Sequence, residues 1–309
     1  MDDWPLLSAE RDRPTIVTLH LVSQLIGKVP TALLPWRNHG WHLTLHLNPR
    51  GFATEPIHVG SRTFDLSLDL VEHCVVLSHL DGGGSVAIAD KSIAAIREEL
   101  LELLGSADLP VDYHGAPNEV EPALSFALDE APRAYDFDSA ARLHRALLSV
   151  DRVLRRFRSG FLGKVSPVHF FWGSFDLAVT RFSGRTAPLH PGGIPNLPDA
   201  VTREAYSHEV SSAGFWPGGA GAEGKAFFCS YAYPAPDGFA DAKVEPASAR
   251  FDPALGEFVL DYESVRTAAD PERSLLDFLE STYRAAADRA QWDRSLECAP
   301  GEPGIPRAV

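Results

Sequence analysis

The sequence predicts an α+β fold: a largely antiparallel sheet flanked by helices, internally duplicated into two pseudo-equivalent halves. The first observation is an internal similarity between residues 19–56 and 153–188. Each stretch has an amphipathic helix, then Gly-Lys-Val, then a strand, and ends in a Thr-x-Pro sequence. The second is the alternating, β-branched pattern that follows each copy. The third is the helical spacing of apolar residues at the end of each half. We therefore expect Lys28 and Lys164 in corresponding places.

The first half continues after its copy with a strand meander and a helix. Residues 63–80 alternate and are rich in β-branched side chains, and the glycines at 82–84 mark a turn before the next strand. Residues 91–104 carry apolar side chains at the spacing of one helical face. Gly105 suits the position just after that helix.

The second half repeats this order with longer loops. Residues 226–234 and 256–265 are predicted strands, and residues 271–292 are a predicted helix with Pro271 in its first turn. We expect one pseudo-symmetric domain over residues 1–297, with a disordered tail after it. Its parts are a first half at about 14–105, a connecting strap at 106–139, a second half at about 140–297 and the tail at 298–309.

Composition excludes several classes of protein. The chain has 309 residues, of which 45% are hydrophobic and 23% charged, as in an ordinary globular protein. The net charge of −14 argues against nucleic acid or an anionic membrane as partner. Three scattered cysteines favour a reducing cytoplasm, and no run reaches the ~18 apolar residues of a membrane span. We expect a cytoplasmic protein whose partner is a small molecule.

Several long motifs carry a family resemblance. They are Ser-Pro-Val-His-Phe-Phe-Trp-Gly-Ser-Phe-Asp at 166–176, Thr-Arg-Phe-Ser-Gly-Arg at 180–185, Glu-Ala-Tyr-Ser-His-Glu at 204–209 and Gly-Phe-Trp-Pro-Gly at 214–218. Together with the two ends of the chain, they resemble an uncharacterised bacterial family, domain-of-unknown-function family 5996. The resemblance implies a single-domain protein and no particular activity, so it carries no catalytic residue to this chain.

Residues 166–182 are apolar enough for one buried strand, and alternation assigns its faces. His169 points to one face together with Arg181, and Trp172 and Asp176 point to the other. A carboxylate among aromatic residues needs a cation or hydrogen-bond donors to stay charged. Arg181 and Arg185 are the nearest cations in sequence, so Asp176 is either part of a structural ion pair or part of a site.

Residues 198–209 predict a short helix that would place Glu204 and His208 four residues apart on one face. This spacing lets a carboxylate and an imidazole hydrogen-bond each other or share a metal ion. A metal needs a further ligand, for which His169 is a candidate. A metal-free pair is also chemically adequate for acid–base work.

The density of polar groups among aromatic side chains in the second half predicts a small-molecule enzyme with His/Glu/Asp acid–base chemistry, with or without a divalent metal. The alternative is a protein that binds a small molecule or partner without chemistry; a purely structural role is least favoured. The candidate catalytic residues are His208, Glu204, Asp176 and His169, the candidate substrate-binding residues are Arg181, Arg185, Trp172 and Trp216, and the candidate metal ligands are Glu204, His208 and His169.

Overall fold

The computed structural model describes residues 3–221 and 224–298, and it has the predicted α+β composition with two antiparallel sheets. The first sheet has the order β1-β2-β4-β5-β6, with β3 paired to β4. Its strands are β1 (His46–Asn48), β2 (Gly51–Ala53), β3 (Ile57–Val59), β4 (Arg62–Asp69), β5 (Cys74–His79) and β6 (Gly82–Ala87). The predicted meander of the first half is therefore confirmed, but the turn predicted at residues 82–84 lies at residues 80–81, and the three glycines begin β6.

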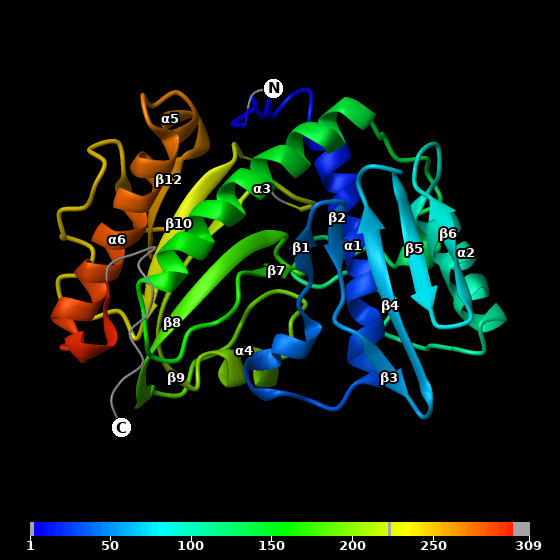
Figure 1. Cartoon of the computed structure of the whole chain (residues 1–309), viewed down its shortest axis with the longest axis horizontal. Coiled ribbons are helices and arrows are strands. Elements are labelled where there is room, and N and C mark those ends of the chain that lie inside the picture. Colours follow the sequence, from blue (N-terminus) through cyan, green and yellow to red (C-terminus); the bar gives the residue numbers. More distant parts are fainter. Residues whose placement is uncertain (1–2, 222–223, 299–309) are drawn as a thin grey trace.

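The second sheet has the order β11-β12-β10-β9-β8-β7. Its strands are β7 (His169–Phe171), β8 (Asp176–Thr186), β9 (His208–Trp216), β10 (Phe227–Tyr233), β11 (Arg250–Asp252) and β12 (Glu257–Asp261). The two sheets meet at β1 and β7, where Leu45 and Phe170 exchange backbone hydrogen bonds of 2.9 and 2.8 Å. The sheets therefore lie edge to edge (Figure 1).

Helices cover these sheets. The α-helices are α1 (Arg13–Leu33), α2 (Ile93–Ser106), α3 (Phe137–Ser159), α4 (Asp199–Ala205), α5 (Tyr262–Arg266) and α6 (Pro271–Arg289), and the 3-10 helices are η1 (Asn38–Leu43), η2 (Phe126–Leu128) and η3 (Arg294–Leu296). The predicted helices at 91–104 and 271–292 correspond to α2 and α6. Ser92 caps α2 by accepting from the Ala95 N–H, and Asp270 caps α6 in the same way.

Helix α3 joins the two halves, since it contacts α1 and β1 on one side and β8 and α6 on the other (Figure 1). Its apolar face, which includes Leu143, Leu147, Val150 and Leu154, is fully buried. Burial of that face in one continuous core fixes one surface of the second sheet. The opposite surface of β8 is left to line a cavity.

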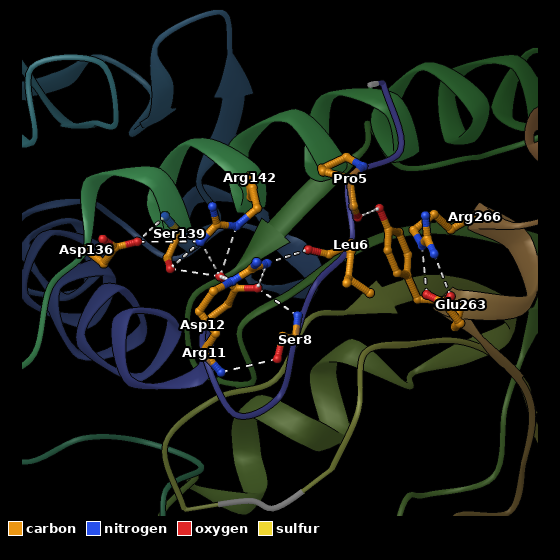
Figure 2. Close-up of polar contacts among 11 residues, drawn as sticks. Pro5, Leu6, Ser8, Arg11, Asp12, Asp136, Ser139, Arg142, Glu263 and Arg266 are labelled. Carbon is orange, nitrogen blue, oxygen red and sulfur yellow. Dashed lines mark hydrogen bonds and ion pairs between the residues drawn. The ribbon is translucent and has the colours of Figure 1, made fainter. Parts of the chain in front are cut away.

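The N-terminus of α1 is tied to α3 by Asp12, whose side chain is completely buried (Figure 2). Its carboxylate accepts hydrogen bonds from Ser139 Oγ at 2.8 Å, from Arg142 at 2.7 Å and from the Ser8 N–H at 2.7 Å. Arg11 adds two more at 2.9 and 3.0 Å. These bonds outweigh the effect of burial, which alone would raise the pKa of Asp12, and they hold that pKa well below its usual value.

The predicted equivalence of the two Gly-Lys-Val segments is wrong. In the first half these residues, 27–29, lie inside α1, which continues through Pro30 to Leu33. In the second half α3 ends at Ser159, and residues 163–165 lie in the loop that follows. Lys28 is therefore helical and buried, whereas Lys164 extends from a loop. The internal duplication accordingly loses this part of its support.

One other expectation needs correction. Residues 166–182 form a hairpin and not one strand, because Phe175 adopts a positive φ of 63° in the turn before β8.

Helix α1 is, within the described ranges, the one helix long and apolar enough to cross a membrane by length and composition, although 78% of that window is buried in the fold. Of the tail expected to be disordered, Cys298 donates a backbone bond to Gly160 O at 3.0 Å, and residues 299–309 lie outside the described part of the chain.

Candidate functional site

A cavity of about 950 Å³ lies between the two halves. Its walls come from α1, η1, the strap at residues 114–119, α4, and one face of β8, β9 and β10. Seven aromatic side chains line it: Trp36, Trp41, Phe171, Trp172, Phe182, Tyr206 and Tyr231. Both this volume and the apolar wall are typical of a small-molecule site.

Alternation along β8 places Asp176, Ala178, Thr180 and Phe182 on the cavity wall, whereas Arg181 points into the core on the other face. Asp176 begins the strand directly after the turn, and Ser174 Oγ donates a hydrogen bond to its carboxylate. Burial raises the pKa of Asp176 to about 6, because this hydroxyl and the backbone N–H of Asp176 compensate the charge only in part.

A second carboxyl group, that of Glu119, lies on the same wall and comes from the strap. Burial and the charge of Asp176 raise the pKa of Glu119 to about 7. No residue in the described ranges donates a hydrogen bond to this carboxylate or pairs with it as a cation. Gly173 makes room for it, since a Cβ there would come within 2.1 Å of Glu119 Oε1. Asp176 and Glu119 thus form an acid pair that faces the cavity.

Further polar groups surround the acid pair. Glu257 on β12 has a pKa raised to about 7 by burial and by Asp176, and burial raises the pKa of the neighbouring Cys229 thiol. The hydroxyl groups of Tyr206 and Tyr231 lie 2.8 Å apart on the cavity wall. Cys229, Tyr206 and Tyr231 line the cavity and can form hydrogen bonds with a bound molecule, whereas Glu257 lies outside the described lining.

Helix α1 contributes a polar stripe at four-residue spacing: His20, Gln24 and Lys28. The Gln24 amide holds the backbone of Asn118, accepting its N–H at 2.7 Å and donating to its carbonyl at 2.9 Å. His20 Nε2 lies 2.8 Å from the Gly173 carbonyl. The stripe therefore fixes the strap and the β7–β8 turn, the two segments that carry Glu119 and Asp176.

The loop at residues 187–198, which we call the cover loop, closes over the cavity through Ile194, Leu197 and Pro198. Two asparagines join it to the strap. Asn118 Nδ2 donates to the Asn196 carbonyl at 2.5 Å, and Asn196 Nδ2 donates to the Val120 carbonyl at 2.8 Å. A reciprocal pair of side-chain to backbone hydrogen bonds therefore holds the cover loop against the strap.

Glu204 and His208 do not share a helix face as predicted. Helix α4 ends at Ala205, and His208 is the first residue of β9, where it pairs with Thr186. Both residues instead approach His39. Glu204 Oε1 accepts the His39 N–H at 3.2 Å, and the rings of His39 and His208 lie 5.9 Å apart.

Of this group, His39 alone lines the cavity, and its ring nitrogen Nε2 lies 2.6 Å from Lys164 Nζ. Burial and the Lys164 charge lower the pKa of His39, so its ring is neutral near pH 7. Glu204 and His208 lie outside the described lining of the cavity. Their catalytic roles stay predictions, and the site is better defined by the acid pair.

The other candidate residues are dispersed. His169 is buried beside Trp41 and His46, and burial lowers its pKa to about 3. Arg181 stacks on Phe157 at 3.6 Å and pairs with Glu280 at 3.4 Å, so it is a core residue.

Arg185 pairs with Glu209 at 2.7 Å, on the protein surface. Trp216 lies outside the described lining and donates to the Ser174 carbonyl at 3.2 Å, which supports the turn before Asp176. Trp172 lines the cavity, and its ring packs on Gly27 of α1, while its role in substrate binding stays a prediction.

The predicted metal ligands do not converge. His169 is buried on β7, where its ring contacts those of Trp41 and His46. Within residues 3–221 and 224–298, no three His, Cys, Asp or Glu side chains are grouped so that they could hold a metal ion. The arrangement instead supports acid–base chemistry or hydrogen bonding by carboxyl groups.

Sequence reasoning missed Glu119, Lys28 and His39. Glu119 lies in an irregular strap where no periodicity assigns a face. Lys28 had a detectable signal, because polar residues at 20, 24 and 28 interrupt an otherwise apolar helix at four-residue spacing. His39 follows no local pattern, since residues 39 and 40 both have positive φ inside η1.

Comparisons with known proteins agree with the resemblance in the sequence. No curated protein matches this chain. No solved structure matches it either. The sequence model of a family described as "Family of unknown function (DUF5996)" matches residues 4–298, which is nearly the whole chain. The chain therefore belongs to the DUF5996 family.

Proposed function

We propose that the protein is a small-molecule enzyme whose acid–base groups are Asp176 and Glu119. The observation that carries this proposal is the juxtaposition of two carboxyl groups, without a cation partner in the described residues, on one wall of an aromatic cavity. The proposal keeps the carboxyl chemistry predicted for Asp176. It replaces the predicted Glu204–His208 pair with Glu119.

The environment of the pair suits proton transfer near neutral pH. Burial raises the pKa of both carboxyls, to about 6 for Asp176 and about 7 for Glu119, and the ionised Asp176 further disfavours the charge on Glu119. Between these values one carboxyl is ionised while the other is protonated. A base and an acid are then available together, as general acid–base catalysis requires.

The alternative is a protein that binds a small molecule without transforming it. The aromatic wall favours this alternative, because apolar and ring contacts alone are enough to hold a ligand. In that case the acid pair would serve as a hydrogen-bonding site. The two functions differ in whether the bound molecule is turned over.

The test is a substrate screen followed by two isosteric variants, Asp176→Asn and Glu119→Gln. We expect each to lower turnover of a hit by about 100-fold or more, since proton transfer by a positioned side chain contributes at least that much. Asp65→Asn is the matched control, because Asp65 on β4 also has a pKa raised by burial but lies outside the described lining of the cavity. A substrate turned over equally well by both cavity variants would refute the enzyme proposal, and ligands that bind without turnover would favour the alternative.

We also propose that the chain is one pseudo-symmetric domain that arose by duplication. The element order supports this in place of the Gly-Lys-Val correspondence. Each half has a long helix, a run of antiparallel strands and a closing helix, and the edge strands β1 and β7 occupy the same position in that order. A superposition of residues 13–106 on 137–289 that failed to align β1 with β7 and α2 with α6 would remove the proposal.

The cellular setting is proposed on composition. The net charge of −14 disfavours nucleic acid and anionic membranes as partners, and the three cysteines are free in the structure. We accordingly propose a cytoplasmic protein with a small-molecule partner. Fractionation of the source cells would test this location.

A further inference from the structure

We infer that the ligand of the cavity carries a carboxylate group and that Lys28 is the residue that binds it. This inference rests on the proposed function, because it assigns the class of molecule that the same cavity holds. It starts from the ammonium group of Lys28, a buried cation that has no counter-charge among the described residues.

Lys28 is 3% exposed and lines the cavity from α1. Its ammonium group lies 5.5 Å from the centre of the Trp172 ring and 6.0 Å from that of Phe126. Asn118 Oδ1 accepts a hydrogen bond from it. An ammonium group has three N–H donors, so this contact leaves two of them without a partner among the described residues.

The other cavity charges do not neutralise Lys28. Within the described residues no carboxylate forms an ion pair with its Nζ, and burial is what lowers the pKa of Lys28, to about 8. Lys91, by contrast, pairs with Glu99 at 2.5 Å on the surface. A buried ammonium without a counter-charge is costly, and an anionic ligand would remove that cost.

The neighbours of Lys28 are held rigidly, as a recognition site requires. Asn118 is clamped through its backbone by Gln24, and its Nδ2 is committed to the Asn196 carbonyl. The Asn118 amide therefore presents its oxygen to Lys28 in one orientation. Trp172 is fixed as well, because its Nε1 donates to the Leu43 carbonyl at 2.6 Å.

The charge balance of the cavity favours a carboxylate over a phosphate. Lys28 is a single cation, and the same cavity holds the two carboxyl groups of Asp176 and Glu119. A dianion would be compensated only in part and would be repelled when Asp176 is ionised. A singly charged acid with an apolar or aromatic body matches both Lys28 and the aromatic wall.

The test uses three fluorinated probes of similar size, followed by ¹⁹F NMR: 4-fluorobenzoate, its neutral isostere 4-fluorobenzamide, and 4-fluorophenyl phosphate. We expect the benzoate to bind more tightly than the other two. Lys28→Met should weaken benzoate binding by at least about tenfold, because a charge-assisted hydrogen bond is lost, and leave benzamide binding unchanged. Lys28→Gln should have the same effect while it keeps a polar group beside Asn118.

Lys164→Met is the matched control. Its ammonium also lies over two aromatic rings, those of Trp41 and Phe182, but Lys164 is outside the described lining of the cavity. Benzoate binding that is equal in the wild type and both Lys28 variants would overturn the inference and leave the proposed function standing. Binding of the benzamide but not of the benzoate would likewise overturn the inference and leave the proposed function standing. Tighter binding of the phosphate would overturn the choice of a carboxylate. Failure of all three probes to bind would overturn the inference about the ligand and leave the proposed function standing, since that function is tested by turnover.

Discussion

Asp12 and Asp176 are both aspartates enclosed by the fold, and their surroundings are opposite. Around Asp12, two arginines, a serine hydroxyl and a backbone N–H saturate the carboxylate, and its pKa falls although burial alone would raise it (Figure 2). Around Asp176, the one side chain that donates is Ser174 among the described residues, and burial raises the pKa to about 6.

The difference separates a structural acid from an acid available for function. The bonds of Asp12 join the start of α1 to α3, so its charge is used to hold two helices together. Few of the hydrogen-bonding positions of Asp176 are occupied by protein groups. Asp176 also borders a cavity, next to a second carboxyl group. A carboxyl that has few partners and borders a cavity is a candidate for function, since buried structural carboxyls are mostly paired.

The largest expected effect concerns stability. Asp12→Asn should lower the free energy of unfolding by about 3 kcal/mol, because it leaves Arg142 and Ser139 beside a neutral amide in a buried site. Asp176→Asn should leave it unchanged or raise it. Urea denaturation measures the free energy of unfolding of both variants. An equal loss of stability in the two variants would contradict the contrast between Asp12 and Asp176.

The next effect is the pH dependence of stability. A carboxyl with a raised pKa in the folded state stabilises the fold fully below its unfolded pKa of about 4, and that contribution is lost as the pH rises through the folded pKa of about 6. Relative to Asp176→Asn, the wild type should therefore lose about 1–2 kcal/mol between these pH values. Asp12 works in the opposite direction: its contribution is present above pH 4 and is lost on acidification. The measurement is the melting temperature of the wild type and of both variants across this pH range. If the melting temperatures of the wild type and Asp176→Asn differ by the same amount at every pH, the raised pKa of Asp176 is contradicted.

A smaller effect on stability is expected from Gly173→Ala. The added methyl group would meet Glu119 Oε1 at 2.1 Å, but that atom is the end of a flexible side chain that can move. We expect a cost below about 1 kcal/mol together with a lowered pKa of Glu119, since the carboxylate is pushed away from Asp176. Thermal unfolding and carboxyl NMR measure the two quantities. A large loss of stability with an unchanged pKa would mark Gly173 as a folding residue only.

The smallest effect concerns the cover loop. Asn196→Gly removes the side chain that bonds the Val120 carbonyl, and glycine tolerates the positive φ of 55° at this position. Stability should change by about 1 kcal/mol or less. Amide hydrogen exchange should nevertheless rise in the strap around residues 118–120 and leave the Asp12 cluster unchanged. Equal exchange in the variant and the wild type would show that the Asn196 hydrogen bond does not hold the strap.

How much the sequence predicts depends on whether a feature is local. Apolar periodicity predicts α2 and α6, alternation predicts the strands, and the aromatic setting of Asp176 makes it a candidate for a site. The prediction fails where backbone conformation decides: Phe175 turns the chain before β8, and α4 ends before His208. Glu119 lies 57 residues before Asp176 in a strap without regular structure, so only the tertiary fold brings the two carboxyls together.

The most direct measurement is the titration of individual carboxyl groups by ¹³C NMR, with Asp12, Asp176 and Glu119 assigned through their Asn and Gln variants. We predict that Asp176 titrates near pH 6 and Glu119 near pH 7, while Asp12 stays ionised throughout that range. Asp176→Asn should lower the pKa of Glu119, because the charge of Asp176 is one of the causes that raise it. Titration of both cavity carboxyls near pH 4, with no response of Glu119 to Asp176→Asn, would contradict the existence of a functional acid pair.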